Sequence, residues 1–131
     1  MKVDLITSES GEERPRIVCL CGSTRFWKTF ELAAFQETAM HGRIVLSIGA
    51  ASGTDEEHFG NLSRVDYSAI KNELDLLHKY KIKMADEVLI LNVGDYIGES
   101  TRSELEFARK HSKKIRWWRE SKHALPGEEW E

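Results

Sequence analysis

Residues 17–26, IVCLCGSTRF, pass from an apolar run through a polar turn into the start of a helix. The first half is continuously apolar, which is typical of a strand that is buried on both faces of a sheet. The second half places a glycine, two hydroxyl side chains and an arginine directly before a helical pattern. A turn of this composition either caps the helix that follows or holds an anion.

The rest of the sequence repeats this alternation of buried strands and helices. The expected strands lie at residues 16–21, 43–50, 87–92 and 113–118, and the expected helices at 26–41, 65–85 and 101–112. Continuous apolar runs indicate the strands. In the longest helix the apolar residues Ile70, Leu74, Leu77 and Met84 recur at spacings of three, four and seven, which indicates an amphipathic helix.

This order of elements predicts an α/β fold with a doubly wound parallel sheet of the flavodoxin or Rossmann type, in the strand order 2-1-3-4. Ligands of such sheets bind beyond the carboxyl ends of the strands, at the point where the strand order reverses. Here that point lies between the first and third strands, which lead into residues 21–26 and 92–104. Both segments are rich in Gly, Ser, Thr and Arg. The sequence therefore predicts one binding pocket between these two segments.

The composition limits the number of domains and the partners. The 131 residues suit one domain, and 19 basic against 22 acidic residues give a formal net charge of -3. This balance argues against a nucleic acid or an anionic membrane as the main partner. No apolar run reaches the roughly 18 residues of a membrane span, and the polar N-terminus lacks the apolar core of a signal peptide. We therefore expect a cytoplasmic protein.

Within the chain we expect one folded unit with polar flanks. Residues 1–14 are interpreted as a flexible arm, 15–118 as the domain and 119–131 as a polar C-terminal tail. Inside the domain, residues 51–63 form a polar loop punctuated by glycine, which is expected to be mobile or to face the substrate.

Cys19 and Cys21 are the only cysteines in the sequence. Two positions apart on a strand, their side chains point to the same face, and two cysteines are too few for a disulfide framework. A metal site would need further ligands, and the flanking sequence contains no other Cys or His. We interpret both residues as buried thiols that pack like small apolar side chains, and we expect no metal and no cofactor.

The turn after the first strand has the chemistry of an anion site. Gly22 would let the backbone turn tightly and approach a ligand, and the amides that follow open a helix whose N-terminus favours negative charge. Ser23 and Thr24 add hydroxyl donors, and Arg25 adds a planar guanidinium suited to phosphate. The alternative is that Ser23 or Thr24 only caps the helix. The turn is neither a P-loop nor a dinucleotide fingerprint, because the Lys-Ser or Lys-Thr pair and further glycines are missing.

The second segment opens the helix expected at 101–112 and carries a glutamate. Thr101 and Glu104 have the spacing of a capping box, in which the acid reaches back to the backbone of the cap. Alternatively, Glu104 faces the anion site. A carboxylate there could attack a sugar carbon whose leaving group is departing. The helix terminus would then help to keep Glu104 ionised.

Three segments together resemble the nucleoside 2-deoxyribosyltransferase superfamily: CGSTRF at 21–26, ADEVLIL at 85–91 and GESTRSELEFARKHSKKI at 98–115. Within it, the chain is most similar to the nucleotide N-glycosidases, which hydrolyse (deoxy)nucleoside 5'-monophosphates to a base and a sugar phosphate. The resemblance covers residues 15–118. It implies a small-molecule nucleotide or nucleoside as substrate and a homodimer or higher homo-oligomer, whose active sites are often completed by a neighbouring subunit. The last expected strand ends in Trp117 and Trp118, of which one would face outward as a dimer contact.

The resemblance also assigns roles to single residues. Glu104 matches the catalytic nucleophile. His78 occupies the position of a catalytic aspartate, and Asp75 lies one helical turn before it, so either could transfer protons. The resemblance and the two segments together give a substrate- and phosphate-binding set of Gly22, Ser23, Thr24, Arg25, Asn92, Gly98, Ser100, Thr101 and Arg102.

The resulting prediction is hydrolysis or transfer at the N-glycosidic bond of a (deoxy)nucleoside 5'-monophosphate or nucleoside, with Glu104 as the nucleophile. One alternative is a non-catalytic domain of the same fold that binds or senses nucleotides, which the displaced aspartate favours. Another is a phosphoribohydrolase or flavin-type binder of related topology. The orientation of Glu104 separates the first two, because a capping box would turn its carboxylate toward its own backbone.

Overall fold

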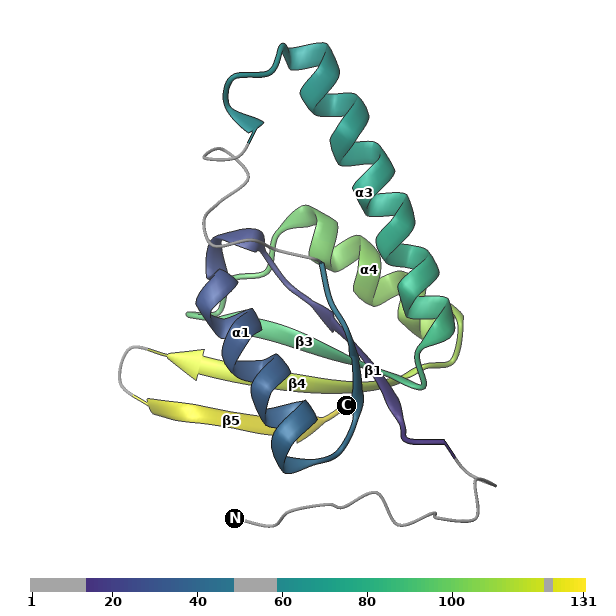
Figure 1. Ribbon diagram of the computed structural model, residues 1–131. Coiled ribbons are helices and arrows are strands. Elements are labelled where there is room, and N and C mark those ends of the chain that lie inside the picture. Colours follow the sequence, from purple (N-terminus) through teal and green to yellow (C-terminus); the bar gives the residue numbers. More distant parts are fainter. Residues whose placement is uncertain (1–13, 49–58, 122–123) are drawn as a thin grey trace.

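A computed structural model of the chain describes residues 14–48, 59–121 and 124–131, which form a sheet flanked by helices (Figure 1). In chain order the elements are β1 (Ile17–Cys21), the 3₁₀ turn η1 (Thr24–Phe26), α1 (Trp27–Phe35), the π-helical turn η2 (Gln36–Met40), β2 (Ile44–Leu46), α3 (Arg64–Met84), β3 (Glu87–Val93), α4 (Glu99–Lys110), β4 (Lys114–Ser121) and β5 (Ala124–Trp130). The arm expected at residues 1–14, as far as residue 13, and the loop expected at 51–63, as far as residue 58, lie outside the described residues.

The sheet has the strand order β2-β1-β3-β4-β5. The first four strands are parallel, which confirms the predicted doubly wound α/β fold and its order 2-1-3-4. The fifth strand was not expected. It lies in the segment interpreted as a polar tail, and it pairs antiparallel with β4, with Arg116 opposite Trp130 and Arg119 opposite Gly127.

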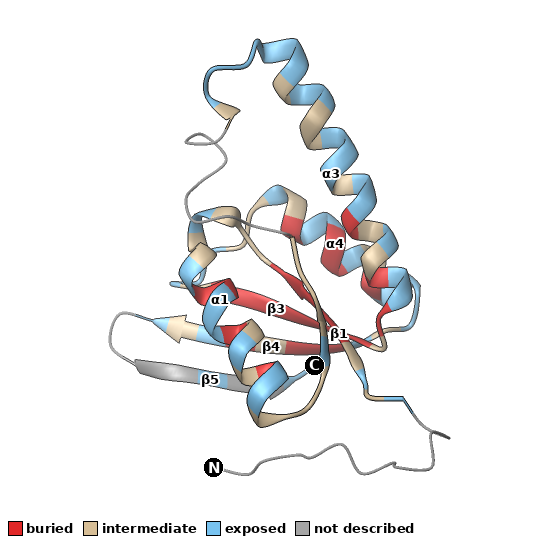
Figure 2. Ribbon diagram, viewed as in Figure 1, coloured by how far each residue is buried: buried red, intermediate tan, exposed pale blue. Residues whose placement is uncertain are grey.

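Alternation along the strands divides the core between the two faces of the sheet. The face covered by α3 and α4 holds Cys19, Cys21, Ile82, Ala85, Val88, Ile90, Leu105, Ala108 and Ile115. The face covered by α1 holds Val18, Leu20, Phe30, Ala33, Leu89, Leu91 and Trp118. Buried residues therefore follow the central strands and the helix sides turned toward them (Figure 2).

The two adjacent tryptophans of β4 divide between the faces for the same reason. Trp118 is 1% exposed and belongs to the α1 face. Trp117 is half-buried against the opposite face, and its indole Nε1 donates a hydrogen bond of 3.4 Å to Glu131. Trp118 is therefore a core residue, and the partly exposed ring is Trp117.

The helix expected at 26–41 is divided into three parts. It begins as η1, continues as α1 and ends as the π-helical turn η2, after which Gly42 has a φ of 62°. The π turn carries Glu37, which is fully buried. Arg116 donates to both Glu37 and the equally buried Glu87, and Arg43 donates to Glu37 at 3.2 Å. This buried ion network lies at the start of β3 and β4, at the edge of the sheet opposite the segments that the sequence singled out.

The long helix α3 begins at Arg64, with the Ser63 hydroxyl accepting from the Asp66 amide at 3.1 Å, and its first half extends away from the sheet (Figure 1). Only His78 and Ile82 of this helix are buried. The predicted apolar stripe does not pack on the sheet. Ile70 is half-buried, and Leu74, Leu77 and Met84 are exposed. Together with the exposed Tyr80, these residues are here called the α3 stripe.

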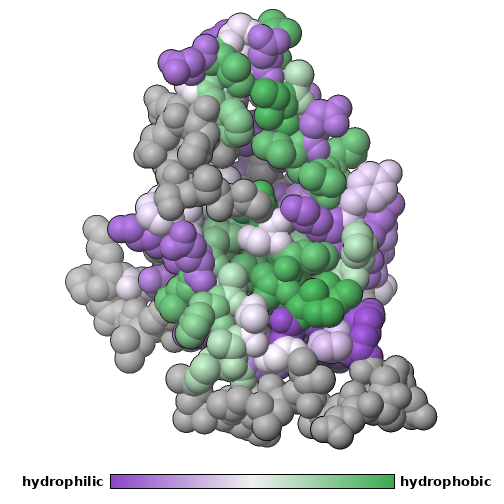
Figure 3. Space-filling model, viewed as in Figure 1, coloured by the Kyte–Doolittle hydropathy of each residue, from purple (hydrophilic) through white to green (hydrophobic). Residues whose placement is uncertain are grey.

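Apolar side chains gather along this helix on the surface of the molecule (Figure 3). None of the helices within 14–48, 59–121 and 124–131 is long and apolar enough to cross a bilayer.

Candidate active site

The two segments singled out by the sequence lie together at the carboxyl edge of the sheet. They follow β1 and β3, which are paired in parallel with Cys21 opposite Ile90. The Arg25 guanidinium lies 4.3 Å from the centre of the Tyr96 ring, and the Phe26 ring meets Tyr96 edge to face at 6.0 Å. The turn after β1 and the turn after β3 are thus in direct contact through these side chains.

Gly22 is explained by packing within the protein. A Cβ atom at this position would lie 3.1 Å from Leu91 Cβ and 3.3 Å from the Phe30 ring, which is too close for ordinary contact. The glycine lets the turn pack against β3 and α1. This differs from the expected reason, which was the approach of a ligand to the backbone.

Ser23 acts as a cap, which was the alternative to an anion-binding role. Its hydroxyl is the N-cap of η1 and accepts from the Arg25 amide at 3.4 Å. Thr24 is the first residue of that turn and is half-buried. Arg25 is exposed apart from its stacking on Tyr96.

The second segment starts its helix earlier than the sequence indicated. α4 begins at Glu99 with Gly98 as N-cap, and no side chain caps it. Thr101 and Glu104 therefore lie inside the helix, and the capping-box alternative is wrong. The first amides of any α-helix have no hydrogen-bond partner within the helix, and here no N-cap side chain accepts from them.

The remaining members of the expected binding set differ in exposure. Thr101 is 2% exposed and Asn92, at the end of β3, is 8% exposed. Ser100 is half-buried and Arg102 is exposed. The Thr101 hydroxyl is therefore sealed inside the protein, whereas Arg102 projects from it.

Glu104 is turned toward the sheet and α3 rather than toward its own helix start. Its side chain is 9% exposed, and Oε2 lies 3.8 Å from Nε2 of His78. This oxygen is buried and has no hydrogen-bond partner among the residues that the structure describes. Asp75, one turn before His78 on α3, is half-buried and adds a negative charge near Glu104.

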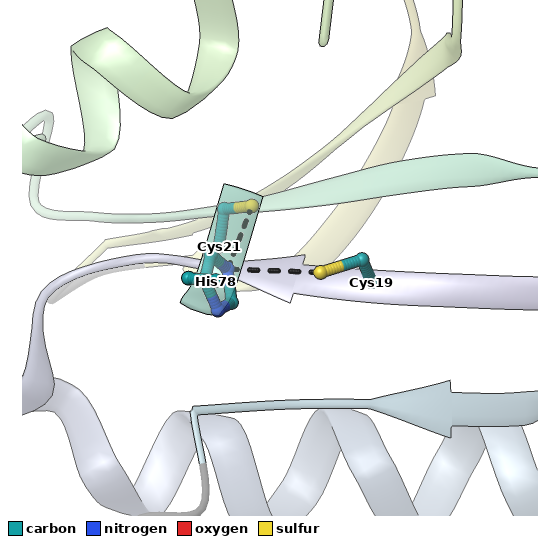
Figure 4. A group of neighbouring side chains, drawn as sticks. All are labelled: Cys19, Cys21 and His78. Carbon is teal, nitrogen blue, oxygen red and sulfur yellow. Dashed lines mark hydrogen bonds between the residues drawn. The ribbon is translucent and has the colours of Figure 1, made fainter. Parts of the chain in front are cut away.

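His78 also contacts both cysteines of β1. Its Nε2 lies 3.3 Å from Sγ of Cys21 and 3.6 Å from Sγ of Cys19, so the ring points at the two sulfur atoms (Figure 4). Both thiols are free and fully buried. The four side chains, Cys19, Cys21, His78 and Glu104, are here called the thiol–histidine cluster.

Both cysteines are buried in the apolar core, as expected, but the cluster corrects the expectation that no further ligand lies near them. The sequence analysis found no further ligands near them, but the fold brings His78 from α3 to within contact, and the three ligand atoms of Cys19, Cys21 and His78 lie within 4.8 Å of one another. The argument that the two cysteines lack further metal ligands is therefore wrong. Two cysteines on one strand face and a histidine on a helix that packs on that face were the available signal.

Burial and mutual contact shift the proton equilibria of the cluster. Burial raises the pKa of Glu104 to about 7, although His78 acts to lower it. Burial therefore opposes the ionised form of this carboxyl, which the helix terminus was expected to favour. Contact with Cys21 and His78 lowers the pKa of Cys19 to about 6, against the effect of burial.

The pKa values of Cys21 and His78 are both raised. Burial holds the pKa of Cys21 well above its usual range. For His78, burial acts to lower the pKa, but contacts with Cys19 and Glu104 outweigh it and the pKa is raised. A proton can therefore be shared among buried groups of this cluster near neutral pH.

No protein-family model and no curated sequence matches the chain. Among solved structures, the fold is similar to that of a 2-deoxyribosyltransferase from the psychrotolerant bacterium Bacillus psychrosaccharolyticus, with a TM-score of 0.60. The two sequences are 14% identical, and the match covers 83% of this chain and 76% of the other. That enzyme is a biocatalyst for the synthesis of antiviral and antitumoral nucleosides. At this identity the similarity establishes a common fold.

Proposed function

We propose that the chain binds a nucleoside or a (deoxy)nucleoside 5'-monophosphate at the carboxyl edge of the sheet and cleaves or transfers at its N-glycosidic bond. The observation that carries this proposal is the orientation of Glu104, which is turned away from its own helix start and lies 3.8 Å from His78 beside the turn after β1. The fold similarity to a deoxyribosyltransferase adds support.

In the proposed reaction, the Glu104 carboxylate attacks the anomeric carbon while the bond from that carbon to the base nitrogen breaks. The base leaves with the electron pair of the broken bond and takes up a proton. Water then hydrolyses the glycosyl ester in a hydrolase, or a second base displaces it in a transferase. The carboxylate must be ionised to attack, so its contact with His78 supports the reactive form.

The proton for the leaving base would come from His78 or Asp75. His78 is nearer to Glu104 and is held by the two cysteines. Asp75 lies one helical turn before it. A histidine or a carboxyl beside the nucleophile suits general acid catalysis.

The phosphate of a nucleotide would bind between the two turns. Arg25 is oriented by Tyr96 and keeps its exposed guanidinium available. The uncapped first turn of α4 offers backbone amides, and amides at a helix N-terminus favour an anion. These amides replace the buried Thr101 hydroxyl as expected donors, while Ser23, Thr24 and Ser100 border the same edge.

The protein is further proposed to act as a homodimer or a higher homo-oligomer. The α3 stripe gives apolar side chains that one chain leaves exposed, which supports such an assembly. A small nucleotide substrate also agrees with the cytoplasmic location expected from the sequence.

A nucleotide-binding or sensing domain without catalysis is the second candidate. It is favoured by His78 in place of an expected aspartate and by the 7% exposure of Glu104, which limits access to the carboxylate. Incubation of the protein with a panel of nucleosides and their 5'-monophosphates, with chromatography of the released base, tests both candidates. Release of base supports the enzyme, whereas binding of several nucleotides without release supports the sensor.

A further inference from the structure

We infer that the thiol–histidine cluster is a binding site for a zinc-type divalent cation, with Cys19, Cys21 and His78 as ligands and Glu104 as the fourth. The three ligand atoms of Cys19, Cys21 and His78 all lie within 4.8 Å of one another. The inference goes beyond the proposed function, since cation binding requires no nucleotide.

The distances fit tetrahedral coordination. Zinc bonds of about 2.3 Å to sulfur and about 2.0 Å to nitrogen place sulfur and nitrogen roughly 3.5 Å apart at tetrahedral angles. The two observed distances from His78 Nε2 are 3.6 Å to Cys19 Sγ and 3.3 Å to Cys21 Sγ. The two sulfur–nitrogen distances are thus close to those between ligands of one zinc ion.

Glu104 supplies an independent observation. Its Oε2 lies 3.8 Å from His78 Nε2, where nitrogen and oxygen ligands of one zinc ion would be roughly 3.3 Å apart. The same oxygen is buried and has no hydrogen-bond partner among the described residues. A buried carboxylate oxygen without a donor is costly, and a cation between this oxygen and the sulfurs would remove that cost.

The fold explains how the ligands meet. Cys19 and Cys21 are alternate residues of β1 and face the same side of the sheet, where α3 contributes His78 and α4 contributes Glu104. An ion bound there would link three elements that are far apart in the sequence. Packing as small apolar residues explains the burial of two thiols, but it does not explain why an imidazole and a carboxylate converge on them.

The donor set selects the kind of ion. Two thiolates and an imidazole favour zinc over magnesium or calcium, which prefer oxygen ligands. Four protein ligands form a closed site of the structural type. A bound ion would therefore also occupy the carboxylate that the proposed reaction needs, so that the metal-loaded form and a form with free Glu104 exclude each other.

Metal titration of the full chain tests the inference. Metal-stripped, reduced protein is titrated with Co²⁺ and then with Zn²⁺. We expect one ion per chain and a sulfur-to-cobalt charge-transfer band that Zn²⁺ abolishes. Cys19→Ser, Cys21→Ser and His78→Gln should each weaken binding by about tenfold or more. The matched controls are His111→Gln and Glu106→Gln, whose exposed side chains lie outside the cluster and should leave binding unchanged.

The unaltered protein decides the outcome even where a variant fails to fold, because absence of the charge-transfer band under reducing conditions would overturn the inference. Equal affinity in Glu104→Gln would overturn the fourth ligand alone. The base-release assay is run on the metal-stripped protein, in which Glu104 is not bound to an ion. There, absence of release contradicts only the proposed function, and release by a chain that binds no metal contradicts only the metal site.

Discussion

At the scale of single residues, Gly22 packs closely against β3 and α1. A methyl group there would lie 3.1 Å from Leu91 Cβ. We expect Gly22→Ala to lower the free energy of unfolding by about 1–3 kcal/mol, because β3 or α1 must shift to admit it. Urea denaturation measures this. Gly127→Ala is the control, since nothing lies within 4 Å of a Cβ there. Equal losses in the two variants would show that the crowding at Gly22 is relieved without cost.

Glu104 allows a test of chemistry separate from folding. Glu104→Gln keeps the size of the side chain and removes the carboxylate, whose Oε2 is buried and has no hydrogen-bond partner among the described residues. The fold should survive, whereas release of base should fall by about a hundredfold or more. Circular dichroism and the chromatographic assay measure the two effects. Glu106→Gln, at an exposed position of the same helix, is the control. Full turnover in Glu104→Gln would exclude it as the nucleophile.

Asp86 makes the folding stability of the protein depend on pH in the acidic range. Arg14 donates two hydrogen bonds to its carboxylate and the Ile17 amide donates one of 2.8 Å, and contact with Arg14 lowers the pKa of Asp86 to about 2. A carboxyl whose pKa is lower in the folded state stabilises the fold above its ordinary pKa and loses this effect as the pH falls toward 2.

The corresponding variant is Asp86→Asn. Because the pair with Arg14 is open to solvent, we expect a loss of about 1 kcal/mol at neutral pH that disappears toward pH 2. Urea midpoints measured across this pH range test it. Asp95→Asn is the control, because asparagine tolerates the φ of 59° at that position. A loss that stays constant with pH would contradict the assignment.

Residue spacing alone could not establish the roles of the site residues. Thr101 and Glu104 have capping-box spacing, yet α4 begins at Glu99 and both lie inside it. Local sequence also hides the contact between Cys21 and His78, because a long crossover separates them. Ser23 shows the opposite case: its cap depends on the residues directly after it, and sequence reasoning included it as an alternative.

At the scale of elements, the buried ion network joins η2, β3 and β4. Arg116 donates to Glu37 and Glu87, and all three are at least 97% buried. Arg116→Met should cost about 3 kcal/mol or more, because two buried carboxylates lose a shared partner. Chemical denaturation checks this. Lys114→Met changes an exposed residue of the same strand and should have little effect. A stable Arg116→Met variant would show that Arg43 can replace the lost charge.

The two elements that could not be predicted, η2 and β5, both make contacts with residues that are far away in the sequence or on another strand. The π-helical turn η2 has the composition of an ordinary helix, and its Glu37 pairs with Arg116, which is far away in the sequence. β5 contains Pro126 and Gly127, which weaken any strand pattern. As an edge strand it needs hydrogen bonds to β4 alone, so proline is tolerated there.

At the scale of the whole molecule, the topology was predictable. Four apolar runs separated by helices allow few arrangements, because parallel strands need crossovers and crossovers are right-handed. The strand order in turn determined that the segments after β1 and β3 meet. It could not determine what α3 packs against, since an apolar stripe has the same pattern whether the sheet or another chain covers it.

The last prediction concerns that stripe. Leu77 is 52% exposed, and it lies on a different side of α3 from the buried His78 and Ile82. If a second copy of the chain covers the stripe, Leu77→Glu should weaken the homo-oligomer by about tenfold or more, since burying a leucine contributes about 1.5–3 kcal/mol. The monomer fold should not change. Asn72→Glu introduces the same side chain about 140° around the helix and is the control. Light scattering after size-exclusion chromatography measures the assembly, and identical masses for Leu77→Glu and the unaltered chain at all concentrations would exclude the α3 stripe as the interface.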